Sequence, residues 1–208
     1  MYKHPVLKIL FAAIVYGSAV QADAVDDVEK AAMASFESMP RVQTVSEMPG
    51  QCGADANVNR YVAYCTSPNI ILVTGEARVL PETAYLVAHA YGHAVQVRHG
   101  VADFALSQIR SRRGEEQMLR GLVERQVDCI AGFLVSRSGV HSEDISELFD
   151  EDPLDDVHWG RNPLRIGPSI SVELAERERW FQIGLNGDLS ACAPGEFTSD
   201  LLLRALRF

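Results

Sequence analysis

The sequence is short of positive charge and has no long apolar run beyond its N-terminal segment. Lys and Arg total 19 against 28 Asp and Glu, which gives a formal net charge of −9 at pH 7. This balance argues against nucleic acid or an anionic membrane surface as the main partner, because both attract basic proteins. No later stretch approaches the roughly 20 apolar residues that a transmembrane helix needs.

Internal repeats, low-complexity linkers and C-x-x-C motifs are also missing. Without repeats or a linker, the 208 residues suffice for one globular domain and hardly for two. The lack of C-x-x-C argues against a zinc site built from cysteines. The chain does have four cysteines, and in an oxidising compartment this even number predicts two disulfides. Three pairings are open, and pairing Cys52 with Cys65 would leave Cys129 with Cys192.

The N-terminus has the layout of a secretory signal peptide. Two lysines precede the apolar run ILFAAIVYGSAV, and the small residues of AVQADA offer cleavage after Ala22 or after Ala24. The alternative is an uncleaved membrane anchor. We expect residues 1–24 to be removed and residues 25–208 to form a single exported domain, periplasmic or secreted, with no stable membrane span.

Hydrophobic periodicity predicts an α+β domain that is mainly helical, with a small β element before the second helix. The β-branched and aromatic runs at residues 60–65 and 69–74 indicate two strands, and the Pro, Gly and Asn content of residues 40–59 indicates a loop. The helix over residues 81–99 begins at a proline and stops at Gly100. The expected helices cover residues 26–39, 81–99, 115–136, 142–149, 169–185 and 203–206, the last capped by Ser199.

Two histidines lie four residues apart in the stretch LVAHAYGHAVQVRHG, within the helix predicted over residues 81–99. At this spacing His89 and His93 project from one face and can reach one tetrahedral metal ion. The alternative is a partly buried histidine pair without a metal, because a chain with six histidines can reach this spacing by chance. The pair alone therefore does not decide between the two.

The next long helix carries Glu124 and Asp128, again one turn apart. Zinc held by two imidazoles takes a third protein ligand, and Glu124 would complete a His₂Glu set. Asp128 would accept the free N–H of a ligating histidine and so fix its tautomer. The alternative, a solvated helix residue, fits the apolar neighbours of Glu124 less well. Together these residues favour a metal site with zinc as the cofactor.

Three motifs, in order, resemble the neutral zinc metallopeptidase family of bacterial exported or membrane-anchored proteins. HAYGHAVQ is similar to that family's His-Glu-[Tyr/Phe]-Gly-His-His-[Val/Ile]-Gln, ERQVDCIAG to its Glu-Leu-Gln-Ala-Asp-Cys-x-Ala-Gly, and RERWFQIG to its Arg-x-x-Trp-Phe-x-x-Gly. The likeness covers about residues 50–195 and implies a zincin-like metallopeptidase domain. By position, it implies the zinc ligands His89, His93 and Glu124, a supporting Asp128, and a disulfide between Cys129 and Cys192.

The departure from the family pattern is Ala90, which stands where the family has the glutamate after the first histidine. That carboxylate moves protons between metal-bound water and the leaving amine, and general acid–base catalysis contributes roughly 10²–10⁴-fold. Alanine has no group that can do this. Ala90 is equally compatible with natural loss and with a laboratory substitution made to trap substrate.

The sequence as a whole therefore predicts a zinc-binding pseudopeptidase that is catalytically impaired and binds a peptide or protein ligand in the cell envelope. Two alternatives remain open. One is an active zinc metallopeptidase in which another group has replaced the missing base. The other is a metal-free binding domain that keeps the fold and is stabilised by its disulfides.

Overall fold

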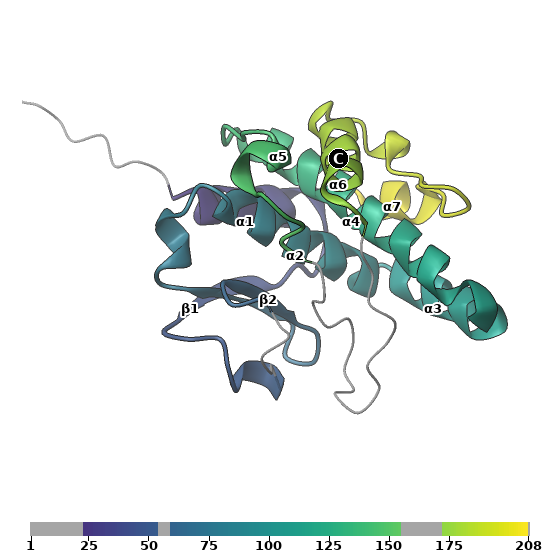
Figure 1. Ribbon diagram of the computed structural model, residues 1–208, viewed down its shortest axis with the longest axis horizontal. Helices are drawn as coiled ribbons and strands as arrows, with labels where there is room; N and C mark the ends of the chain where they lie inside the picture. The colour runs from purple at the N-terminus through teal and green to yellow at the C-terminus, as the bar shows by residue number, and fades with distance from the viewer. Residues whose placement is uncertain (1–22, 54–58, 155–171, 208) are drawn as a thin grey trace, which may run out of the picture.

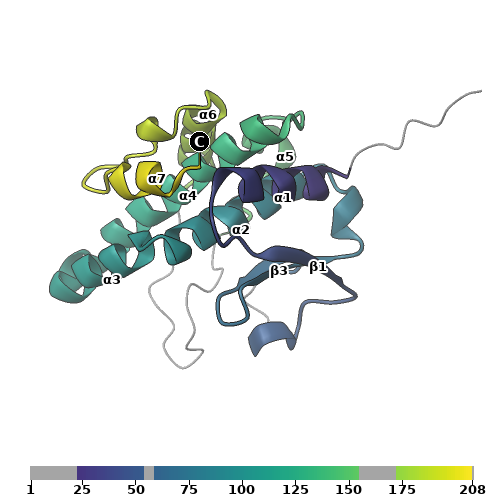
Figure 2. The same ribbon diagram turned by 180° about the vertical axis from the view of Figure 1, so that it is seen from behind.

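The computed structural model describes residues 23–53, 59–154 and 172–207, which form an α+β fold that is mainly helical. The sheet lies on one side of the molecule and the helices lie on the other (Figure 1, Figure 2). The predicted fold class is confirmed at this level, including a β element that precedes the histidine-bearing helix. Residues 1–22, which hold most of the predicted signal peptide, lie outside the described residues.

Three strands form the sheet, in the order β1-β3-β2. β1 (Arg41–Val45) pairs parallel with β3 (Ile70–Thr74), and β2 (Val62–Cys65) pairs antiparallel with β3. β2 and β3 are the two strands that the apolar runs predicted. The prediction of a loop over residues 40–59 is wrong for β1. This strand has mostly exposed side chains and gains its conformation from pairing with β3, a tertiary contact that local propensity does not reveal.

The central strand β3 is buried on both faces. Ile71 and Val73 belong to the main core between the sheet and the helices, whereas Leu72 packs on the opposite face with Met48 and Cys65. Side chains alternate between the two faces of a strand, so a strand covered on both sides needs an unbroken apolar run. The disulfide between Cys52 and Cys65 borders the smaller cluster and helps to cover this second face.

The helices α1 (Ala24–Ser35) and α2 (Thr83–Arg98) cover the other face of the sheet (Figure 2). α2 is apolar on nearly every side and is buried between the sheet and α4 (Glu116–Ser138), as expected for a helix with no polar face. Gly100 ends it with a φ of 81°, a left-handed conformation that favours glycine. α3 (Val101–Ser111), which the sequence did not predict as a helix, follows at once.

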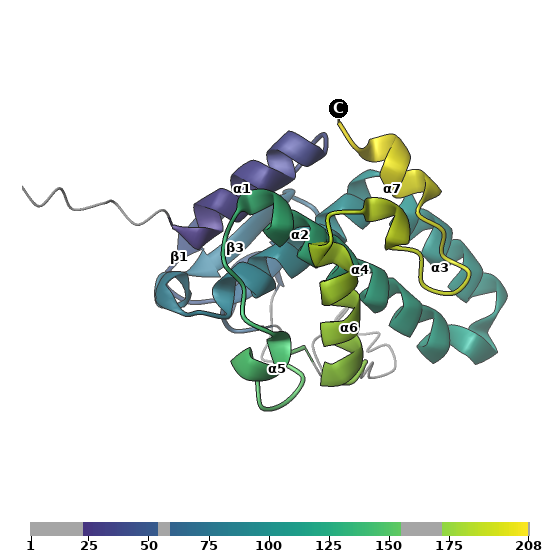
Figure 3. The same cartoon turned by 90° about the horizontal axis from the view of Figure 1, so that it is seen from above.

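The remaining helices lie on the outer side of α4, and α6 crosses over it (Figure 3). They are α5 (Ile145–Leu148), α6 (Leu174–Leu185) and α7 (Asp200–Ala205), and single 3-10 turns occur at Gln51–Gly53, Ala77–Val79, Arg113–Glu115 and Leu189–Ala191. Ser199 precedes α7 but does not cap it as predicted, because its hydroxyl donates to the Ser190 carbonyl oxygen, 2.9 Å away. No helix in the described ranges is both long and apolar enough to cross a membrane.

All four cysteines form disulfides, in the pairs Cys52–Cys65 and Cys129–Cys192. The second pair is the one that the family resemblance implied. It joins α4 to the segment that follows α6 and closes a sequence separation of 63 residues. Bridges that close long loops restrict the unfolded chain most, so this one contributes on the order of 4 kcal/mol in the chain-entropy model.

Two glycines allow α4 and α6 to approach until their backbones touch. A Cβ added to Gly132 of α4 would lie 2.0 Å from the carbonyl oxygen of Phe181, and one added to Gly184 of α6 would lie 1.9 Å from that of Cys129. Neither contact can be relieved by turning a side chain, because the opposing atoms belong to the backbone. The crossing therefore requires glycine on both helices.

We expect Gly132→Ala to destabilise the protein, because α6 must move away from α4 to admit the methyl group. Overpacking of this kind costs about 1–3 kcal/mol or more. Gly121→Ala on the same helix is the matched control, because its Cβ would meet only the end of the Arg125 side chain, at 3.4 Å. Alanine there should be neutral or stabilise by up to about 1 kcal/mol. Urea unfolding of both variants measures the difference, and equal stabilities would contradict this account of the crossing.

Candidate metal centre

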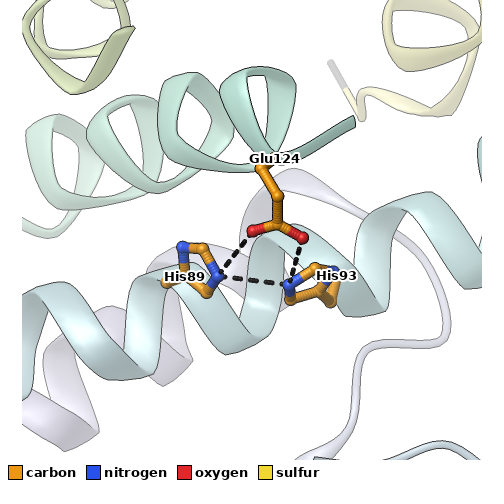
Figure 4. A group of neighbouring side chains, drawn as sticks. All are labelled: His89, His93 and Glu124. Carbon is orange, nitrogen blue, oxygen red and sulfur yellow. Dashed lines mark hydrogen bonds and ion pairs between the residues drawn. The ribbon is translucent and has the colours of Figure 1, made fainter. Parts of the chain in front are cut away.

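The structure brings together the three residues that the sequence predicted as metal ligands (Figure 4). His89 and His93 project from one face of α2, and Glu124 points down to them from α4. The Nε2 atoms of the two imidazoles are 3.1 Å apart. The Glu124 carboxylate lies 3.5 Å from Nε2 of His89 through Oε2, and 3.7 Å from Nε2 of His93 through Oε1.

The two imidazole nitrogens and the Glu124 carboxylate, which faces one imidazole with each of its oxygens, lie close enough together to surround a metal ion. Ligand atoms bound at 2.0–2.1 Å with tetrahedral angles lie about 3.3 Å apart. The nitrogen–nitrogen separation of 3.1 Å and the two nitrogen–oxygen separations of 3.5 and 3.7 Å lie on either side of that value, and all three side chains are buried or half-buried. Two imidazoles and a carboxylate are a common donor set for transition metals. The cluster can therefore hold a metal ion with little rearrangement, although the donor set alone does not identify the metal.

Asp128 fixes which imidazole nitrogen of His89 faces the cluster. Its Oδ1 lies 2.9 Å from Nδ1 of His89 and also accepts a hydrogen bond of 2.9 Å from the Tyr85 hydroxyl. A carboxylate can only accept, so Nδ1 of His89 carries the proton and the lone pair of Nε2 faces His93 and Glu124. This is the tautomer that a metal ligand requires, and the supporting contact is the one expected for Asp128.

A buried arginine that sequence reasoning did not single out completes the surroundings of the cluster. Arg177 of α6 is 1% exposed. Its Nη1 donates to Oδ2 of Asp128 at 3.0 Å and lies 3.7 Å from Oε2 of Glu124, while its Nε donates to Oδ1 of Asp152 at 2.7 Å. The signal that could have found it is its place in RERWFQIG, the third family-like motif. Tyr85 was equally detectable, because it lies one helical turn before His89.

The buried residues around the cluster carry more negative than positive charge. Glu124, Asp128 and Asp152 are three buried carboxylates, and within the described part of the chain Arg177 is the one arginine or lysine that pairs with them. Burial raises the pKa of Glu124 above its usual value and is the largest cause of that shift. A buried unpaired charge is costly, and a divalent cation on Glu124 would offset the two negative charges that Arg177 leaves.

The histidines are suited to the same role. Burial, followed by the nearby His89 and Arg177, lowers the pKa of His93 well below its usual value. His93 is therefore neutral at pH 7 and needs to lose no proton before it binds a metal ion. His99 lies beyond the end of α2 against the Phe36 ring and is not part of the cluster. His158 falls outside the described residues.

Ala90 is 6% exposed and packs in the main hydrophobic core. It lies three residues before His93, so both residues belong to the same side of α2. Each described carboxylate at the cluster has a partner: Glu124 faces the two imidazoles, Asp128 holds His89, and Oδ1 of Asp152 pairs with Arg177, while its buried Oδ2 has no hydrogen-bond partner among the described residues. The described residues thus offer no evident replacement for the missing glutamate.

The spacing of α2 and α4, and hence the size of the cluster, depends on Gly92. A Cβ added there would lie 2.8 Å from both the carbonyl oxygen and Cγ1 of Val127, which precedes Asp128 on α4. The glycine lies between the two histidines in the sequence. Close contact of the two backbones therefore occurs at the site itself.

No protein-family model, curated protein or solved structure matches the chain. A cluster of two histidines and a glutamate is not specific to one family. The resemblance carried by the three motifs therefore remains a prediction, and the case for a metal centre depends on the contacts described above.

We expect Gly92→Ala to weaken metal binding. The methyl group pushes Val127 and its helix away from α2, which moves Glu124 and Asp128 off the positions that the histidines require. The expected loss is about tenfold or more, as for outer contacts that orient ligands. Cobalt(II) titration followed by visible absorption measures it, with Gly121→Ala as the control. Unchanged cobalt affinity would show that the helix spacing does not set the ligand geometry.

Proposed function

We propose that this protein is an exported, zinc-binding pseudopeptidase related to the neutral zinc metallopeptidases. In this proposal His89, His93 and Glu124 hold zinc, and hydrolysis is lost or very weak because position 90 is alanine. The domain then binds a peptide or protein ligand in the cell envelope. The observation that carries the proposal is the ligand cluster next to an apolar residue at the position of the general base.

Zinc is the metal that the resemblance to the metallopeptidases implies, and the donor set is compatible with it. Zinc proteins use imidazole nitrogen and carboxylate oxygen as ligands at short distances in tetrahedral geometry. A His₂Glu set leaves a fourth position for water or a ligand. When bound, zinc would lower the pKa of a water molecule and polarise a carbonyl group. The chain's own residues would supply the orientation: Asp128 holds His89, and the contact between α2 and α4 sets the position of Glu124.

The impaired chemistry follows from what surrounds the ligands. A peptidase needs a group that removes a proton from the attacking water and returns it to the leaving nitrogen. Ala90 cannot do so, and the described carboxylates at the cluster are held in ion pairs or hydrogen bonds. A bound peptide would therefore remain uncut or would be cut slowly, which suits a binding role.

Export is supported by the covalent structure. Two disulfides in one domain of this size are typical of oxidising compartments such as the periplasm or the cell exterior. The signal-like N-terminal sequence points to the same compartment. A net charge of −9 favours a protein or peptide partner over nucleic acid.

The first test is the zinc content of the purified protein. We expect one zinc per chain by elemental analysis, and we expect Glu124→Ala or the pair His89→Ala and His93→Ala to abolish it. Glu116→Ala is the control on the same helix, because the half-buried Glu116 pairs with Arg120 and does not belong to the metal cluster. A wild-type chain that stays free of metal in excess zinc would overturn the proposal in favour of a metal-free binding domain.

The second test restores the missing base. Ala90→Glu should create or raise peptidase activity on a mixed peptide library by roughly 10²–10⁴-fold, the usual contribution of general acid–base catalysis. Ala90→Gln is the matched control, because glutamine has the same size as glutamate and has no carboxylate. Clear wild-type activity that Ala90→Glu does not raise would instead identify an active enzyme with another base.

A further inference from the structure

We propose that Arg177 is a positioning residue of the metal centre: it holds the Asp128 carboxylate in the orientation that presents Nε2 of His89 to the metal. The inference rests on the proposed function for the identity of the metal. It concerns a residue that contacts none of the imidazoles and acts on His89 through Asp128. The three residues come from α6, α4 and α2, so one chain of contacts crosses the three helices.

The two oxygens of Asp128 have different partners. Oδ2 accepts from Nη1 of Arg177 at 3.0 Å, and Oδ1 accepts from the Tyr85 hydroxyl and from Nδ1 of His89, both at 2.9 Å. Asp128 is completely buried, so no water replaces a lost partner. Without Arg177, Oδ2 loses its charged donor and the carboxylate is free to rotate. Rotation moves Oδ1 away from Nδ1 of His89, and nothing then favours the tautomer with a free Nε2.

The arrangement suits a guanidinium better than an ammonium. Arg177 donates from Nε to Asp152 and from Nη1 to Asp128, two directions fixed by its planar fork. A lysine at this place is a single point charge and cannot hold both carboxylates where they are. The same fork places Nη1 3.7 Å from Oε2 of Glu124, so the guanidinium faces the oxygen nearer to His89. At 3.7 Å this contact with Glu124 is longer than a hydrogen bond, so Arg177 acts on the histidines mainly through Asp128.

If Arg177 had a purely structural role, a different result would be expected. Substituting Asp152 distinguishes a structural role from a positioning role. Arg177 has two close carboxylate partners, and only Asp128 leads to a metal ligand. If Arg177 merely neutralises buried charge, losing either partner should matter alike for metal binding. If it positions Asp128, only the Asp128 contact should affect metal affinity. Asp152→Asn is therefore the matched control for the Arg177 variants.

The experiment is a double-mutant cycle on zinc affinity, measured by competition with a chelator in the full chain. We expect Arg177→Gln to weaken zinc binding by about 10–100-fold, and Asp128→Asn to do the same. Once Asp128→Asn is present, adding Arg177→Gln should change the affinity by no more than about twofold, because the contact through which Arg177 acts is already lost; about twofold is the usual scatter of such a cycle. Asp152→Asn should cause a much smaller loss than Arg177→Gln. Equal losses in both Asp128 backgrounds, or equal losses for Asp152→Asn and Arg177→Gln, would overturn the proposal.

Arg177→Lys repeats the cycle with a positive charge kept in the buried site, and it carries the test if Arg177→Gln does not fold. The tautomer of His89 supplies a second readout, from imidazole nitrogen chemical shifts in metal-free protein. We expect one form protonated at Nδ1 in the wild type and a mixture in the Arg177 variants. An unchanged tautomer would overturn the positioning role. A wild type without zinc affinity would overturn the proposed function, and the tautomer would still decide the role of Arg177.

Discussion

The candidate metal centre depends on the hydrogen bonds and the ion pair of the buried Asp128 carboxylate. This carboxylate belongs to α4, accepts hydrogen bonds from Tyr85 and His89 of α2, and pairs with Arg177 of α6. A carboxylate without access to water must satisfy its oxygens inside the protein, so the three helices have little freedom to move independently. The position of His89 is thus a consequence of helix packing as much as of its own side-chain rotamer.

The neighbours of Asp128 on α4 also hold this helix against α2 and α6, through other kinds of contact. Val127 touches the backbone of α2 at Gly92, and the carbonyl of Cys129 touches Gly184 of α6. The sulfur of Cys129 forms the disulfide with Cys192. Backbone contact, ion pairing and a covalent bond therefore all converge within about one turn of one helix. Close packing transmits small displacements, so a change at any of these contacts reaches the ligands.

The parts of the fold and the site that the sequence predicted are those fixed by local spacing. His89 and His93, like Glu124 and Asp128, follow the helical repeat, and the apolar runs of β2 and β3 follow from burial. The parts it did not predict depend on contacts between distant segments. β1 has few buried side chains and is defined by its pairing with β3, and α3 begins at a glycine that reads equally well as a stop.

Arg177 illustrates the same limit at the site. An arginine in a helix rich in charged residues looks like a solvated side chain, because sequence gives no measure of burial. Only the folded arrangement shows that its partners are carboxylates from two other segments, Asp128 and Asp152. Arg177 matches the arginine of the family motif in RERWFQIG, but its role becomes visible only from its contacts in the structure.

The disulfide between Cys129 and Cys192 has a consequence for how the protein matures. Cys129 directly follows Asp128, so oxidation of this thiol and capture of a metal ion order the same turn of α4. A ligand that binds only the folded chain stabilises it in proportion to the logarithm of its concentration, and by the same linkage a pre-ordered helix binds that ligand more tightly. If the cluster binds a metal ion, disulfide formation and metal binding therefore favour each other. The bridge would then order the cluster before the ion binds, in whichever compartment the two thiols are oxidised.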